Sequence, residues 1–129
     1  MPWHEAGRAL QDGSRSLATL TMHIAALAAL TLLLLAQRGA ASDLDRAERL
    51  FASERWDAAA HAYERVTASD PSQARAWFKL GYAYLRLGAY GSARTAYERA
   101  AEFEDVRDAA LHNLDRLDAL LESGAIRTS

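Results

Sequence analysis

The chain has no cysteine, a single lysine at position 79 and only two prolines. The lack of cysteine excludes disulfides and thiolate metal sites, but it leaves the cellular compartment open. Because so few prolines interrupt the chain, its many alanine, leucine, glutamate and arginine residues favour helices throughout. We therefore predict an all-α protein, whose 129 residues suffice for one small domain and an appendage.

The sequence also lacks a strong charge imbalance and the motifs of a catalytic site. The net charge is −2 and no basic patch is interleaved with aromatic residues, which argues against nucleic acid as a partner. There is no glycine-rich phosphate loop, and no two histidines have metal-ligand spacing. The scattered histidines are His4, His23, His61 and His112. We predict a protein that is not an enzyme and has no metal or cofactor.

One long run carries no fixed charge, the 22 residues between Arg15 and Arg38. About 20 apolar residues cross a bilayer as a helix, so we predict one transmembrane helix over 16–37. A cleaved secretory signal is the competing interpretation, because the small residues 39–41 could precede a cut before Ser42.

The segment 1–15 favours a retained anchor, because it is long for a signal and carries Glu5 and Asp12. Trp3 and Leu10 share one helical face, so this segment is either an interfacial helix with Trp3 at the headgroup level or an unstructured tail.

His23 is the one titratable group inside the predicted span. An ionisable residue in a membrane segment is a functional hypothesis by default, and binding a haem or a metal-centred pigment is one such role. We favour a plainer interpretation, in which a neutral histidine near the end of the span reaches the interface.

Residues 56–100 contain the same helical segment twice, 34 residues apart. Trp56 recurs as Tyr90, and five residues return unchanged. They are Ala59, Ala62, Tyr63, Glu64 and Arg65, which recur as Ala93, Ala96, Tyr97, Glu98 and Arg99. A fixed period in this range is typical of stacked helical repeats.

The helical period continues from Ser42 to the end of the chain. Ser42 suits the N-cap of a first helix, and Asp70, Pro71 and Gln73 form a capping-box start for a third. The predicted helices are 43–53, 56–69, 72–87, 90–103 and 106–122.

The second of these units resembles a tetratricopeptide repeat, whose signature is an aromatic, Leu-Gly, an aromatic, then Ala, an aromatic and Ala. The matching residues are Trp77, Leu80, Gly81, Tyr84, Ala93, Tyr97 and Ala100. Asp105 stands where a closing proline is usual. The unit before it departs at Asp43 and Arg46, where Trp and Leu are expected.

The resemblance covers 42–122 and implies two helical hairpins, 40–73 and 74–107, then a cap helix 108–122 and a frayed tail 123–129. We expect Gly81 and Ala47 where paired helices cross, with Ala59 and Ala93 opposite them. Four aromatic residues are expected to fill the core around them: Tyr63, Trp77, Tyr84 and Tyr97.

The last helix is expected to end the array. An apolar stripe would cover the preceding hairpin, formed by Leu111, Leu114, Leu117 and Leu121. Asp115 and Asp118 stand where Gly81 and Tyr84 stand one unit earlier, so a following helix would bury carboxylates. The outer face is therefore that of a terminal cap.

The resemblance implies that the first helix of each pair lines a concave groove. Its groove-facing residues would be Glu48, Phe78, Tyr82, Arg86, His112 and Arg116. Interface centres favour aromatic residues and arginine, so Phe78, Tyr82 and Arg86 are the candidate anchors. We do not expect the family's grip on a C-terminal carboxylate, because Leu44 and Phe78 stand where a lysine and a polar partner would be needed.

Two repeats and a cap fall short of the three or so repeats that usually give independent stability, which predicts a supporting partner. We interpret the chain as a membrane-anchored accessory or scaffold subunit of a multiprotein membrane complex. The alternatives are a cleaved, soluble periplasmic adaptor that binds peptides in its groove and, more distantly, a pigment- or haem-binding membrane subunit through His23.

The side of the membrane is open. Arginines after the span outnumber those before it, which by the positive-inside rule places the repeats in the cytoplasm. Those later arginines lie largely in the predicted folded domain, which weakens the count. We favour a single-pass protein of the bacterial inner membrane with periplasmic repeats, without excluding the cytoplasmic side.

Overall fold

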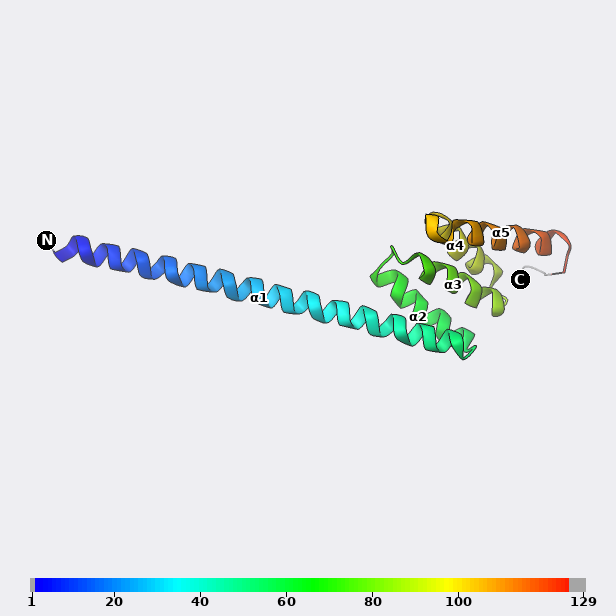
Figure 1. The fold of residues 1–129 in the computed structure, drawn as a ribbon, viewed down its shortest axis with the longest axis horizontal. Helices are drawn as coiled ribbons and strands as arrows, with labels where there is room; N and C mark the ends of the chain where they lie inside the picture. Colours follow the sequence, from blue (N-terminus) through cyan, green and yellow to red (C-terminus); the bar gives the residue numbers. More distant parts are fainter. Residues whose placement is uncertain (1, 126–129) are drawn as a thin grey trace. The chain divides into compact units, whose positions relative to one another are not determined.

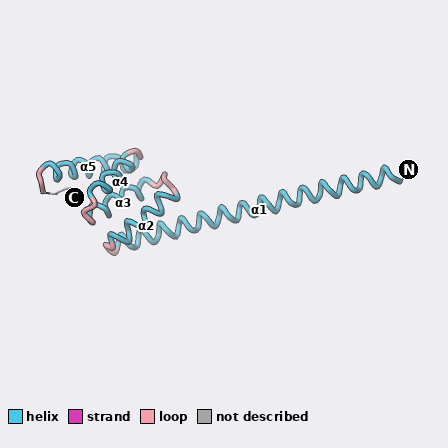
Figure 2. The backbone as a smooth tube through the Cα atoms, turned by 180° about the vertical axis from the view of Figure 1, so that it is seen from behind, coloured by secondary structure: helices cyan, strands magenta, loops and turns pink. Residues whose placement is uncertain are grey.

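The computed structural model describes residues 2–125, and within them every regular element is helical (Figures 1 and 2). This confirms the all-α fold. The elements are α1 (Pro2–Ala52), α2 (Trp56–Ser69), α3 (Ala74–Arg86), α4 (Tyr90–Ala101), the 3₁₀ helix η1 (Glu104–Val106) and α5 (Arg107–Glu122).

The chain divides into two compact units, 1–38 and 39–129. In the first unit the described side chains are exposed, and α1 is long and apolar enough to cross a membrane. A signal sequence near an N-terminus can meet the same requirements of length and composition, so the helix is a candidate span. The unstructured-tail interpretation of 1–15 is wrong for the part described, because α1 is helical from Pro2.

The predicted start of the first repeat helix at Ser42 is also wrong. Helix α1 passes through this position, and the Ser42 hydroxyl donates a hydrogen bond to the Gly39 carbonyl, 2.7 Å away, instead of capping an N-terminus. The physical reason is that no proline separates the apolar run from the first repeat. The single Gly39 costs only about 1 kcal/mol relative to alanine, so backbone hydrogen bonding continues through it.

In the second unit the helices pack in sequence, α2 on α3, α3 on α4 and α4 on α5. The C-terminal part of α1 joins the same core, because Ala47 is fully buried with Tyr63 of α2. Helix α2 has the predicted bounds, whereas α3 begins at Ala74 and α4 ends at Ala101. The last turn before α5 is the 3₁₀ helix η1, so α5 begins at Arg107.

The late start of α3 follows from the hydrogen bonds of Asp70. Its carboxylate accepts from the Ser72 backbone N–H (3.1 Å), the Ser72 hydroxyl (2.6 Å) and the Gln73 amide (2.9 Å). This is an Asx-type turn, which competes with helix formation. The predicted capping box is therefore absent here, and Pro71 lies in the turn before the helix.

The core contains the predicted small residues at the helix crossing. A Cβ added to Gly81 would lie 2.8 Å from Cδ1 of the fully buried Tyr97 ring, so glycine permits the close approach of α3 and α4. Tyr63 is likewise fully buried. Trp77 and Tyr84 pack against the core as expected, but they are only half-buried and lie at its edge.

Helix α5 covers the second hairpin with most of the predicted stripe, since Leu114 packs against the core and Leu121 is half-buried. Leu117 and Ala110 are buried, while Leu111 is 46% exposed. Asp118 forms an ion pair with Arg94 of α4. The chain leaves the helix after Glu122, and of the predicted frayed tail residues 126–129 lie outside the described part.

Candidate functional site

The predicted groove residues lie on the C-terminal part of α1, on α3 and on α5. Glu48, Phe78 and Tyr82 are half-buried, and Arg86, His112 and Arg116 are exposed. We refer to these six residues as the groove set.

Tyr82 and Arg86 meet at one aromatic ring, that of Trp56. The Tyr82 ring centroid lies 5.6 Å from that of Trp56 and 5.5 Å from that of Phe51. The Arg86 guanidinium carbon lies 4.8 Å from the Trp56 centroid, a cation–π geometry. Aromatic rings held by one another offer contact area at little entropic cost, so this cluster suits the centre of an interface.

The carboxylate of Glu48 already accepts hydrogen bonds from two side chains of this chain. The Tyr63 hydroxyl donates to its Oε1 at 2.9 Å, and Lys79 donates to its Oε2. Burial, together with Glu48, raises the pKa of Tyr63. Glu48 therefore neutralises Lys79 and satisfies a core hydroxyl. Among the described residues neither Arg86 nor Arg116 forms an ion pair.

Phe78 stands over the second core tyrosine, with its ring centroid 5.6 Å from that of Tyr97. The Tyr97 hydroxyl is buried and has no hydrogen-bond partner within the described residues. Asn113 of α5 lies close to this hydroxyl without completing a hydrogen bond. Burial raises the pKa of Tyr97 to about 12, against the opposing effects of Asn113 and of the Arg116 charge.

The two predicted membrane residues lie in the first unit. Trp3 is exposed on α1. The Nδ1 of His23 lies 2.6 Å from the Thr19 carbonyl oxygen, a contact that would direct the other ring nitrogen outward. Among the described residues no group of three or more His, Cys, Asp or Glu side chains could hold a metal ion.

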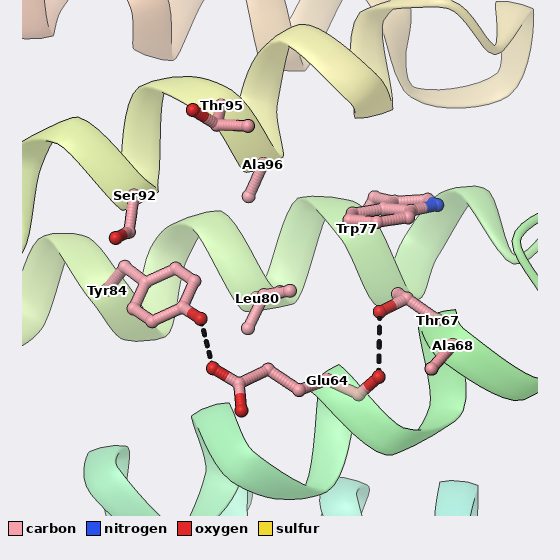
Figure 3. Close-up of a pocket in the computed structure, with 9 residues that line it drawn as sticks. All are labelled: Glu64, Thr67, Ala68, Trp77, Leu80, Tyr84, Ser92, Thr95 and Ala96. Carbon is pink, nitrogen blue, oxygen red and sulfur yellow. Dashed lines mark hydrogen bonds between the residues drawn. The ribbon is translucent and has the colours of Figure 1, made fainter.

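A pocket of about 400 Å³ lies between α2, α3 and α4, on residues that sequence reasoning assigned to the core or did not single out (Figure 3). We call it the α2–α4 pocket. Its lining consists of Glu64, Thr67, Ala68, Trp77, Leu80, Tyr84, Ser92, Thr95 and Ala96. The sequence feature that could have indicated this pocket is the set of small residues on α2 and α4, which leave Trp77 and Tyr84 of α3 uncovered.

Glu64 is the one charged residue in this lining. The Tyr84 hydroxyl donates to Glu64 Oε1, and His61 Nδ1 lies 3.2 Å from Oε2. These contacts, the one from Tyr84 foremost, lower the pKa of Glu64. Burial and Glu64 together raise the pKa of Tyr84 to about 12. At neutral pH the pocket therefore holds a carboxylate beside a protonated phenol.

Trp77 is fixed at the opposite end of the pocket from Tyr84, with Leu80 between them (Figure 3). Its indole N–H donates to the Pro71 carbonyl at 2.9 Å. The Arg99 guanidinium lies 5.4 Å from the Trp77 ring centroid, although Arg99 is not part of the pocket lining. The tryptophan thus has a set orientation and already attracts one cation.

Stacked helical hairpins with a small residue at each crossing define a helical-repeat protein. Residues 44–110 match the family described as tetratricopeptide repeat, and the chain belongs to that family. It is also similar to the protein O-mannosyl-transferase TMTC1 of Mus musculus, with 39% identity over 64 residues. That match covers 50% of this chain and 7% of the mouse protein, so the activity in its name describes a much longer protein.

Proposed function

We propose that this protein is a membrane-anchored interaction module that acts as an accessory or scaffold subunit of a membrane complex. One observation carries the proposal: a single helix, α1, supplies both a candidate membrane span and the first helix of the repeat domain. Tetratricopeptide repeats serve as protein-binding units, so the anchor would keep the binding surface at the membrane.

The partner-binding surface in this proposal is the groove set. Its support is the Tyr82–Trp56–Arg86 cluster and the exposure of Arg86 and Arg116, neither of which forms an ion pair within the described residues. A partner segment with apolar and acidic side chains would complement both features.

The short array supports the need for a partner. Leu111 and Leu120 are partly exposed on the cap helix α5. About three repeats are usually needed for independent stability, and this chain has two and a cap.

We place the protein in a bacterial inner membrane and favour periplasmic repeats. A protease-protection assay on spheroplasts can decide on which side of the membrane the repeats lie.

Intact-mass measurement of the mature protein from washed membranes tests the anchor. The full chain of 14.1 kDa in the membrane fraction is the expected result. A soluble product that lacks residues 1–41 would support the periplasmic adaptor instead and overturn the anchor.

The haem- or pigment-binding alternative rests on His23, whose ring lies beside the Thr19 carbonyl. Its test is the visible absorption spectrum of protein purified from native membranes. We expect no visible band, and a band that His23→Leu removes would establish the alternative.

A further inference from the structure

We propose that the α2–α4 pocket is a second binding site, which takes a lysine or arginine side chain of a partner protein. This pocket lies among α2, α3 and α4 and shares no residue with the groove set. The inference rests on the proposed function only in taking the bound cation to belong to a protein.

The pocket has the charge for a cation. Glu64 is its one charged lining residue, and the Tyr84 hydroxyl favours the ionised carboxylate. Outside the lining, His61 contacts Glu64 at 3.2 Å and Asp57 at 3.7 Å, so its charge when protonated is shared between two acids. Arg99 lies 5.4 Å from the Trp77 ring centroid, but its charge is paired with Glu102. The net charge around Glu64 is therefore negative or neutral, and a bound cation would offset the carboxylate.

The pocket also has the shape and polarity for an aliphatic stem that ends in a cation. Leu80 forms its floor, Ala68 and Ala96 lie on opposite sides, and Trp77 and Tyr84 stand at its two ends (Figure 3). Long basic side chains bury their methylene stems against apolar surface, and aromatic faces attract the charged head. The pocket volume is within the range of small-molecule sites, so one side chain fits.

The contact between α4 and α5, one repeat later, is an example within this chain of an arginine side chain bound by a carboxylate. There Arg94 of α4 pairs with Asp118 of α5 and also feels the charge of Glu98. Thirty-four residues earlier, the positions of Arg94 and Glu98 are Ala60 and Glu64. Between α4 and α5 the chain thus supplies its own arginine to a carboxylate. In the α2–α4 pocket the carboxylate of Glu64 has no arginine among the lining residues.

The rim favours a peptide over a free amine. Ser92 and Thr95 are exposed lining residues of α4. The Thr95 hydroxyl faces its own helix, 3.2 Å from the Gly91 carbonyl, and can still accept a hydrogen bond. Hydroxyls beside a side-chain pocket can bind the backbone amides of a segment that passes between α2 and α4.

The test is NMR titration of the full chain in a maltoside detergent, with the tripeptide acetyl-Ala-Arg-Ala-amide as probe. We expect saturable shifts of the Trp77 indole and of the Thr95 and Ala96 amides. The same tripeptide with citrulline, which has the shape of arginine without its charge, should bind about fivefold more weakly or not at all. Equal binding of both peptides would overturn the proposal.

Variants separate the pocket from the rest of the surface. Glu64→Gln keeps an acceptor for Tyr84 and should weaken probe binding about fivefold, whereas Glu98→Gln, the same change one repeat later, should not. Should Glu64→Gln unfold, Thr95→Lys places a cation at the exposed rim and should compete with the probe. Unchanged binding in the folded pocket variant would contradict the assignment.

Choline chloride is the third probe, because a lipid headgroup is the other source of such a cation. Tighter binding of choline than of the arginine peptide would overturn the assignment to a protein partner. None of these titrations involves the groove set, so they can fail while the proposed function holds, or succeed while it fails.

Discussion

Glu54 and Gly88 occupy the same position in two turns, 34 residues apart, and both have positive φ, 57° and 75°. In each turn the backbone N–H of the next residue donates a hydrogen bond to a carbonyl of the preceding helix. The Arg55 N–H donates to the Leu50 carbonyl (3.0 Å), and the Ala89 N–H donates to the Tyr84 carbonyl (2.9 Å). This is the Schellman arrangement, in which the left-handed residue is usually glycine. The first hairpin therefore holds a glutamate where the second holds glycine.

Glu54→Gly should stabilise the protein. A side chain in the left-handed region costs about 1 kcal/mol, and the exposed Glu54 has no ion pair among the described residues to lose. We expect the free energy of unfolding in urea to rise by about 0.5–1 kcal/mol. Ser53→Gly, one residue earlier in the same turn, is the control and should lower it; equal losses in both variants would contradict the strain.

Gly81→Ala should destabilise the protein despite the better helix propensity of alanine. The added Cβ would lie 2.8–3.0 Å from three atoms of the buried Tyr97 ring. Overpacking costs about 1–3 kcal/mol, which outweighs the gain of about 1 kcal/mol from replacing glycine in a helix. Gly91→Ala on α4 is the matched control, since nothing lies within 4 Å of its new Cβ, and it should be neutral or stabilising. A stabilised Gly81→Ala variant would show that the helix crossing is loose.

The two core tyrosines should respond in opposite ways to loss of the hydroxyl. Tyr63 donates to Glu48, so Tyr63→Phe should cost about 1–2 kcal/mol. The buried Tyr97 hydroxyl has no partner in the described part of the chain, so Tyr97→Phe should be neutral or stabilise by about 1 kcal/mol. Urea unfolding of both variants measures this, and an equal loss in each would mean that Tyr97 does form a hydrogen bond.

The Tyr84–Glu64 contact should make stability depend on acid pH. The pKa of Glu64 is lowered in the folded protein, so its contribution is present above the unfolded value of 4.5 and is lost as the pH falls through the folded pKa. The difference in unfolding free energy between pH 6 and pH 3 should therefore shrink in Tyr84→Phe.

The charged neighbours of this contact are His61 and, through it, Asp57, and both remain in the variant. Tyr90→Phe makes the same chemical change on α4 outside the pocket, and its pH dependence should match the unmodified protein. A Tyr84→Phe variant with an unchanged difference would mean that the hydroxyl contributes nothing to the ionised carboxylate.

Much of the fold follows from local sequence. The 34-residue echo placed α2 at its bounds, and the need for a small residue at the crossing identified Gly81. Two helix starts were predicted wrongly. One error arose because α1 continues past Ser42, and the other because a turn competes with the helix cap at Asp70. Ser42 is a good cap only if the helix stops, and no residue before it stops α1. Asp70 could cap a helix, but its turn with Ser72 competes.

The contacts at the candidate sites could not be predicted, because they depend on how separate helices pack together. The groove-facing set stays a prediction from positions in the repeat. Those positions could not indicate that Glu48 accepts hydrogen bonds from Tyr63 and Lys79. The signature assigned Trp77 and Tyr84 to the core by residue type. Their exposure depends on how far apart α2 and α4 lie, which no local pattern gives.

Site-specific photo-crosslinking from Tyr82 in native membranes tests whether the groove set binds a partner at the membrane. With benzoylphenylalanine at this position, we expect one discrete crosslinked protein in the membrane fraction. This product should be lost when Arg86→Glu is added and retained with Arg49→Glu, the charge control. The same probe at Tyr90, outside the groove set, should not give that product. No crosslink from Tyr82, or the same product from both positions, would contradict a groove that binds a partner at the membrane.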